Sequence, residues 1–252
     1  MKDVFPKKLD YSDRDIKFYY EGRTKGRLVV FGDSFSETST RKDPNETCWV
    51  FVLAKMLDFS ILNYSRGGSS LQYSKQMLFE YMETEYDKND YIVFISTSYT
   101  RIPSVPANVD SGWAAALNNY MLGELHGRRE YREIFKFFDT NNNAMEYISR
   151  YITTMTDFNN DLVLIYTYLN NLVNKTCFIP AFNHGNNLPK CIVNDFNLME
   201  PSDNENVIRN NPMKDDRICH FSTENNKILA NMFFRYFETD SYHYFKMRKF
   251  VK

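Results

Sequence analysis

Short apolar runs alternate along this chain with segments in which apolar residues recur at helical spacing. Four almost continuous apolar runs predict buried strands at residues 28–31, 59–64, 90–96 and 176–182. The intervening segments predict helices at residues 46–57, 70–85 and 144–173, the last as one helix or two, and a further helix after residue 222 or 223. This alternation indicates an α/β fold, a three-layer α/β/α sandwich around a central and mostly parallel sheet.

Two local features refine the predicted helices. Asn45 precedes the first helix and is the residue type that caps helix N-termini, so we expect it to be the N-cap. In the long helical segment, apolar residues recur every three or four positions, and we expect this stripe to pack in the core rather than to bind a cofactor. The stripe consists of Ile148, Tyr151, Ile152, Met155, Phe158, Leu162, Ile165 and Leu169.

The strand pattern divides the chain into an arm and one domain. Residues 1–26 are polar and charged and predict an N-terminal arm on the surface. Residues 27–252 predict a single α/β domain, interrupted at about 101–175 by a helical insertion. Residues 183–215 are rich in Asn and irregular, and their length is typical of a functional loop.

Composition excludes several classes of function. The net charge of −1 over 252 residues gives no general attraction to nucleic acids or to anionic membranes. No apolar run reaches the roughly 18 residues of a membrane span, and the first residues lack the apolar core of a secretion signal, so we expect synthesis in a cytoplasm. The cysteines form no C-x-x-C pair and no metal-ligand spacing, which predicts reduced thiols and no metal site; they are Cys48, Cys177, Cys191 and Cys219.

Chemistry-bearing residues gather where the predicted strands end. Three strands run into polar or small residues, namely Asp33-Ser34, Gly67-Gly68-Ser69 and Ser96-Thr97-Ser98. A fourth polar element, residues 215–220, precedes the last helix and contains two aspartates and a histidine. An acyl-transfer site needs a nucleophile, a base, an orienting carboxylate and donors to an oxyanion, and these segments contain all four.

Three blocks carry a family resemblance: Val30-Phe31-Gly32-Asp33-Ser34-Phe35, Asn63 to Ser70, and Asp216 to His220. With them the chain resembles the SGNH/GDSL hydrolase superfamily, in particular its divergent members encoded by bacteriophages. The resemblance implies a flavodoxin-like sandwich with Ser34 as nucleophile and His220 as base. It also implies Asp216 as the acid that orients the base, and Gly68, five residues after Asn63, as an oxyanion donor.

The sequence departs from the family pattern in two places. The family's third block is Gly-x-Asn-Asp, whose asparagine donates to the oxyanion, whereas this chain has Ser96-Thr97-Ser98-Tyr99. Ser98 or the Thr97 hydroxyl is the replacement donor available there. In the family the aspartate precedes the histidine by three residues; here Asp216 precedes His220 by four and Asp215 by five. Asp216 is the preferred acid, and Asp215 remains the alternative.

The resemblance implies a serine esterase that requires no metal or organic cofactor. For phage-type relatives the implied substrate is an acylated small molecule or an O-acetylated surface carbohydrate. The alternative is a catalytically weak or inactive protein of the same fold that binds a virion or host-surface partner, in the host cytoplasm or the virion. A nucleotide-binding protein is disfavoured because no G-x-G-x-x-G or P-loop occurs.

The remaining histidines and one arginine are weaker candidates. His184 follows the fourth predicted strand and can line the cleft, whereas His126 and His243 are expected to be solvated. Arg101 follows the third strand, where it either binds a substrate carboxylate or pairs with an acidic side chain of the insertion.

Overall fold

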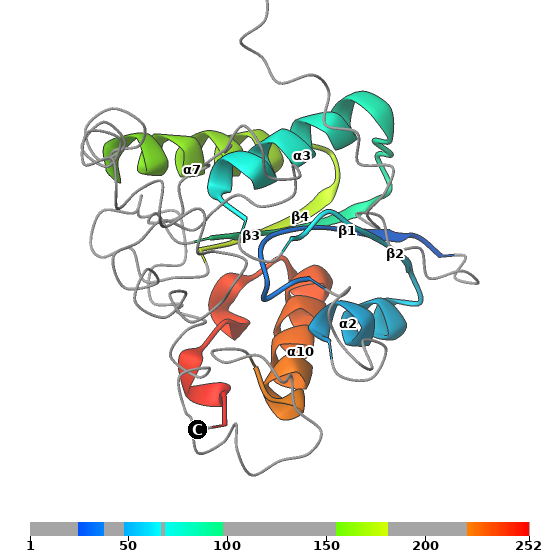
Figure 1. Cartoon of the computed structure of the whole chain (residues 1–252). Coiled ribbons are helices and arrows are strands. Elements are labelled where there is room, and N and C mark those ends of the chain that lie inside the picture. The colour runs from blue at the N-terminus through cyan, green and yellow to red at the C-terminus, as the bar shows by residue number, and fades with distance from the viewer. Residues whose placement is uncertain (1–24, 38–47, 67–68, 98–154, 181–220, 252) are drawn as a thin grey trace, which may run out of the picture.

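The computed structural model describes residues 25–37, 48–66, 69–97, 155–180 and 221–251 (Figure 1). Its strands are β1 (Arg27–Phe31), β2 (Ser60–Asn63), β3 (Tyr91–Ser96) and β4 (Lys175–Pro180). Its α-helices are α2 (Trp49–Leu57), α3 (Leu71–Thr84), α7 (Met155–Asn170) and α10 (Thr223–Thr239), and two short 3₁₀ helices follow, η4 (Tyr242–Tyr244) and η5 (Met247–Lys249). All four predicted strands are confirmed, with ends shifted by no more than two residues.

The four strands form one parallel sheet in the order β2-β1-β3-β4. This arrangement confirms the α/β class predicted from the apolar runs. From β1 the chain moves outward to β2 and then crosses back over β1 to β3. The winding therefore reverses between β1 and β3, and in open parallel sheets ligands bind at such a switch point, beyond the carboxyl ends of the strands.

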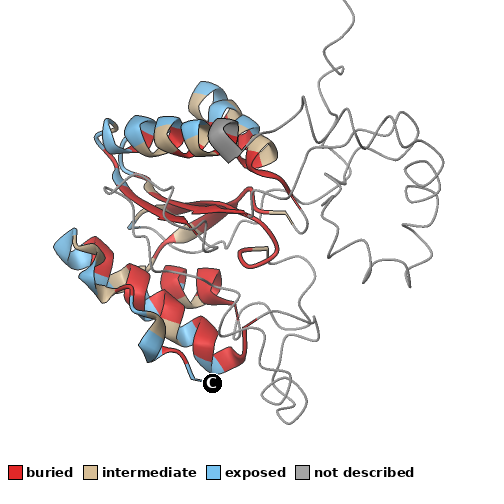
Figure 2. Cartoon of the chain, turned by 90° about the vertical axis from the view of Figure 1, so that its left-hand side faces the viewer, coloured by how far each residue is buried: buried red, intermediate tan, exposed pale blue. Residues whose placement is uncertain are grey.

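Helices cover both faces of this sheet (Figure 1). The helices α3 and α7 lie on one face, and α2 and α10 lie on the other. Because apolar side chains are required on both faces, the strands are buried along almost their whole length (Figure 2). The two faces carry two separate apolar clusters, one under each pair of helices.

A row of aromatic rings crosses the sheet on the α3–α7 face. Phe31, Phe94 and Phe178 are register partners on β1, β3 and β4, and Tyr64 follows β2. Their ring centroids are 5.2 Å apart for Tyr64 and Phe31, 6.0 Å for Phe31 and Phe94, and 5.6 Å for Phe94 and Phe178. Offset stacking of this kind adds to the apolar burial of each ring, so the row ties the four strands together on this face.

The start of α2 differs from the prediction. The helix begins at Trp49 with Cys48 as its N-cap, not at residue 46 after Asn45, which lies outside the described residues. Cys48 makes no side-chain capping bond. Instead the backbone N–H of Trp49 donates to Oδ1 of Asn226 on α10, at 3.0 Å. The cap is supplied by another helix, which is why local spacing misplaced it.

The apolar stripe of the long helix is confirmed where the structure describes it. Phe158, Leu162, Ile165 and Leu169 of α7 are buried against the sheet. The first four positions of the stripe lie outside the described side chains, as do all but the last two residues of the predicted arm and most of the predicted insertion. The described part of that insertion, α7, covers the β3–β4 side of the sheet.

A buried ion pair joins the amino ends of the strands. Asp90, 3% exposed, accepts hydrogen bonds from Arg27 Nε and Nη2, the latter at 2.6 Å, and from the Tyr81 hydroxyl at 2.6 Å. Burial raises the pKa of Tyr81, so the phenol keeps its proton and donates a hydrogen bond to the carboxylate of Asp90. Asp90 thus links the start of β1 to α3 and β3.

Candidate functional site

A tight turn follows β1 at the carboxyl edge of the sheet. The carbonyl of Asp33 accepts hydrogen bonds from the backbone N–H groups of Ser36 and Glu37, both at 3.0 Å. The Asp33 side chain accepts a third, at Oδ1 from the N–H of Phe35 at 3.0 Å. The turn therefore folds around Asp33, and Ser34 is its next residue, 8% exposed.

The second oxygen of Asp33 binds the neighbouring strand. The Thr97 hydroxyl, just beyond β3, donates to Oδ2 of Asp33 at 3.0 Å, and both side chains are buried. This bond spans the switch point between β1 and β3. A hydroxyl has one proton to donate, and in the structure the Thr97 hydroxyl donates its proton in the hydrogen bond to Asp33. Of the two predicted replacement donors, Thr97 is therefore bound to Asp33, and Ser98 lies outside the described part of the chain.

The segment after β2 holds the turn from the other side. Asn63 donates from Nδ2 to the carbonyl of Ser36 at 2.8 Å, and its Oδ1 accepts from the N–H of Ser65 at 2.9 Å. The carbonyl of Gly32 accepts both the Ser69 hydroxyl at 3.1 Å and the N–H of Arg66 at 3.2 Å. The residues that flank Gly67 and Gly68 are thus fixed to Gly32, two positions before Ser34, although Gly68 itself lies outside the described residues.

Helices α2 and α10 complete the support. The indole Nε1 of Trp49 donates to the carbonyl of Phe35 at 2.9 Å. The ring of Phe35 packs on Phe221, which directly precedes the N-cap of α10, with centroids 5.1 Å apart. Asn226 donates to the carbonyl of Ser222 at 3.1 Å while it caps α2. The N-terminal ends of both helices therefore meet at the turn.

The electrostatic setting favours negative charge beside the turn. The first residue of α2 binds Phe35 through its indole, the segment before α10 contacts Phe35, and α3 begins two residues after Ser69. Helix N-termini carry partial positive charge. Three of them at one edge stabilise an anion or a developing oxyanion there.

The predicted site residues divide into two groups. Ser34 is described and lies in the turn between Asp33 and Phe35. Gly68, Ser98, Asp216 and His220 lie outside the described residues, as do Asp215 and the weaker candidates Arg101, His126 and His184. His220 is nevertheless covalently bonded to Phe221, whose position against Phe35 is described.

Other nucleophilic or titratable groups are poor alternatives. His243 is exposed on η4, as predicted, and its ring lies 3.7 Å from that of Tyr244. Cys48 and Cys177 are buried free thiols, and burial raises the pKa of Cys177, so this thiol stays protonated and unreactive. In the described ranges, no cluster of three metal-ligating side chains occurs and no helix is long and apolar enough to cross a membrane.

The sequence pattern does not predict three residues that support the turn: Asn63, Trp49 and Asn226. The pattern uses Asn63 only to locate Gly68 five residues later, whereas in the structure its amide donates to the carbonyl of Ser36 in the turn. Asn226 had a detectable signal, because it is a polar residue on the apolar face of an amphipathic helix. Such a residue needs a buried partner, and the structure supplies it at α2.

One cavity of about 480 Å³ lies away from this turn. It is lined by the connection from α7 to β4 and by the last residues of α10, including Asn174, Lys175 and Asp240. Lys175 begins β4, so the cavity lies at the amino end of that strand, the opposite edge of the sheet from Ser34. The cavity is therefore separate from the candidate site.

Neither the protein-family models nor the curated proteins searched contain a match to this chain.

Gly32→Ala is expected to destabilise the turn by about 1–3 kcal/mol, as overpacking does. A Cβ at Gly32 would lie 2.8 Å from Oγ and 3.2 Å from Cβ of Ser36. Urea unfolding would measure the loss. Ser36→Ala removes the nearer atom, a buried hydroxyl that has no hydrogen-bond partner among the described residues. The double variant Gly32→Ala/Ser36→Ala is therefore expected to recover part of the lost free energy of unfolding. If the effects of the two single substitutions simply add, the clash between the new Cβ and Ser36 is contradicted.

Proposed function

We propose that this chain is a serine ester hydrolase of the SGNH type, built as a three-layer α/β/α sandwich. Support for the layers comes from the parallel sheet with α3 and α7 on one face and α2 and α10 on the other. Support for the site comes from the Gly-Asp-Ser turn at the switch point of that sheet. The proposed catalytic residues are Ser34, His220 and Asp216, with Asp215 as the alternative acid.

The contact between Phe35 and Phe221 carries the proposal. Phe35 follows the proposed nucleophile in the chain, and Phe221 follows the proposed base. The two residues are 186 positions apart, are almost fully buried, and have ring centroids at 5.1 Å. A serine–histidine pair requires its two chain segments to be neighbours, and this contact meets that requirement.

In the proposed mechanism, Ser34 Oγ attacks the carbonyl carbon of an ester while His220 accepts its proton. The N–H groups of Ser34 and Gly68, with Ser98, donate to the oxyanion, and the N-termini of α2, α3 and α10 add to its stabilisation. His220 returns the proton to the leaving alcohol as the ester bond breaks. Water, deprotonated by His220, then hydrolyses the acyl-enzyme and releases the acid.

The proposed substrate is an acetyl ester of a surface carbohydrate. This choice follows the resemblance to phage-encoded relatives. The mechanism uses only the chain's own residues and requires no cofactor.

Covalent labelling tests the nucleophile independently of the natural substrate. A fluorophosphonate is expected to add to Ser34 of the folded wild type, and peptide mass spectrometry would locate the adduct. Ser34→Ala should abolish labelling. Ser60→Ala is the matched control, because Ser60 begins β2 at the opposite edge of the sheet. A folded wild type that stays unlabelled, or an adduct at another serine, would overturn the proposal.

One observation favours the second candidate function, a weakly active or inactive protein that binds a virion or host-surface partner. The Thr97 hydroxyl is bound to Asp33, so one of the two replacements for the family's oxyanion asparagine is lost. Loss of one such donor costs roughly 10²–10³ in rate. Absence of labelling, together with saturable binding of the folded protein to host envelope material, would support this candidate.

A further inference from the structure

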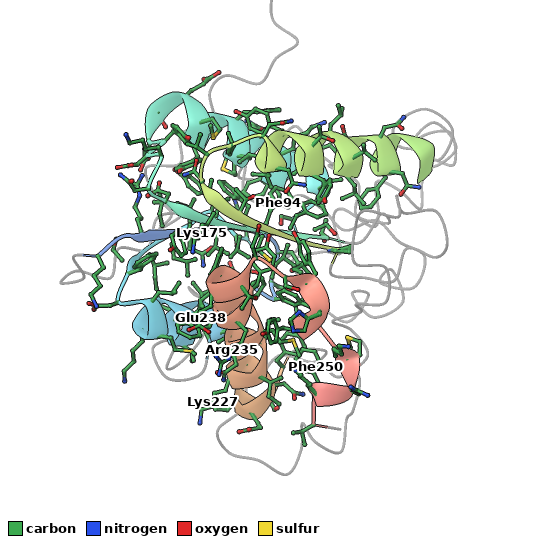
Figure 3. The ribbon with its side chains drawn as sticks, turned by 180° about the vertical axis from the view of Figure 1, so that it is seen from behind. Phe94, Lys175, Lys227, Arg235, Glu238 and Phe250 are labelled. Carbon is green, nitrogen blue, oxygen red and sulfur yellow. The ribbon has the colours of Figure 1, made fainter. Side chains whose placement is uncertain are left out.

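The C-terminal segment packs against the same aromatic contact that supports the site. After α10 the chain folds back through η4 and η5 along that helix (Figure 1). Phe250, 6% exposed, stacks on Phe221 with centroids 5.5 Å apart and an interplanar angle of 15° (Figure 3 labels Phe250). The ring of Phe221 therefore contacts both Phe250 and Phe35.

The last described residue is held by a paired hydrogen bond. Asn225, a fully buried residue in the first turn of α10, accepts from the N–H of Val251 at 2.8 Å and donates to the carbonyl of Val251 at 3.0 Å. Both bonds go to one residue, so they fix the register of the segment as well as its position. Loss of the Asn225 amide would remove the side-chain partner of both main-chain groups of Val251 at once.

We propose that this C-terminal clamp, Asn225 with Phe250 and Val251, positions the segment before α10 for catalysis at Ser34. The proposal rests on the serine hydrolase function proposed above. Asn225 and Phe250 are positioning residues that act through Phe221, to which His220 is bonded. They touch neither the substrate nor the reacting atoms.

The packing order explains how the clamp acts. Phe221 packs on Phe35, and Phe35 is fixed by the indole of Trp49 and by the side chain of Asp33. Phe250 stacks on the same Phe221 ring. Removal of Phe250 opens space beside this ring and lets Phe221 shift relative to the turn, since large-to-small substitutions leave a cavity that collapses only partly. A displacement of about 1 Å between catalytic groups can lower the rate about 10²-fold.

A matched pair of phenylalanines separates positioning from stability. Phe245 lies in the same segment with the same 6% exposure, but it packs on Phe233 and Tyr236 instead. At a temperature at which both variants are folded by circular dichroism, Phe250→Ala is expected to lower kcat about 10-fold or more with little change in KM, and to slow phosphonylation of Ser34. Phe245→Ala is expected to change both rates less than about 3-fold. Equal losses in the two variants, or none in Phe250→Ala, would overturn the proposal.

A second pair tests the amide. Asn225→Leu keeps a side chain of similar size but makes neither bond to Val251, whereas Asn231→Ala removes an amide from the exposed side of α10. Only Asn225→Leu should lower kcat. Hydrogen exchange separates the two hypotheses: amides of residues 35–37 should exchange faster in Phe250→Ala than in Phe245→Ala, whatever the chemistry of Ser34. If the wild type stays unlabelled but the exchange rates of the two variants differ in this way, the hydrolase function and the catalytic role of the clamp are both contradicted. The mechanical link between the clamp and the turn would still stand.

Discussion

Ser34→Ala is expected to lower kcat/KM for p-nitrophenyl acetate and butyrate by about 10⁴-fold or more, to the level of background hydrolysis. His220→Ala should cause a similar loss, because the serine hydroxyl is a weak nucleophile without a base to accept its proton. The double variant should be no slower than either single variant. Residues that act as one unit give such non-additive losses.

The controls for this experiment use the same substitutions elsewhere in the chain. Ser60→Ala changes a serine at the amino end of β2, and His243→Ala changes an exposed histidine on η4. Both should retain wild-type rates. Additive losses in the double variant would mean that Ser34 and His220 act separately, and unchanged rates in all variants would contradict the esterase on these substrates.

Asp90→Asn is expected to destabilise the protein by about 3 kcal/mol, measured by urea unfolding. Asparagine keeps the volume of the side chain but removes the charge that faces Arg27, a side chain only 21% exposed. Its amide group also brings a donor toward the hydroxyl of Tyr81, which itself donates in the wild type. Breaking a buried pair from one side leaves the other charge uncompensated, and this term dominates the loss.

An exposed ion pair provides the comparison. Arg235 and Glu238 on α10 form a 2.9 Å pair with side chains 60% and 43% exposed (both labelled in Figure 3). Glu238→Gln should change the free energy of unfolding by less than about 1 kcal/mol, because solvent screens such pairs. A loss at Asp90 no larger than that at Glu238 would contradict the structural role assigned to the buried network.

The sheet could be predicted from the sequence because its strands are covered on both faces. Burial on both faces demands nearly continuous apolar runs, and all four runs became strands. The start of α2 could not be predicted in this way. Its cap comes from Asn226, which is 177 residues from Trp49 in the chain, and no local spacing encodes such a partner.

In the candidate site, the position of the Gly32-Asp33-Ser34 turn could be predicted from the sequence, but the hydrogen bonds that support this turn could not. Gly32-Asp33-Ser34 follows an apolar strand, so its place at the carboxyl edge follows from the pattern. The bond from Thr97 to Asp33 depends on β1 and β3 being neighbours, and the apolar runs do not specify strand order. For the same reason, the sequence could not show that the Thr97 hydroxyl is bound to Asp33.

The turn at Ser34 is held almost entirely through groups other than the Ser34 side chain. Asp33, Asn63 and Trp49 bind main-chain atoms of residues 35 and 36, and among the described residues none hydrogen-bonds to the Ser34 hydroxyl. A substitution of the Ser34 side chain therefore leaves the hydrogen bonds of Asp33, Asn63 and Trp49 to the turn in place. With cysteine at this position, the same support would hold a thiol, so that the proposed hydrolase could be redesigned around a different nucleophile.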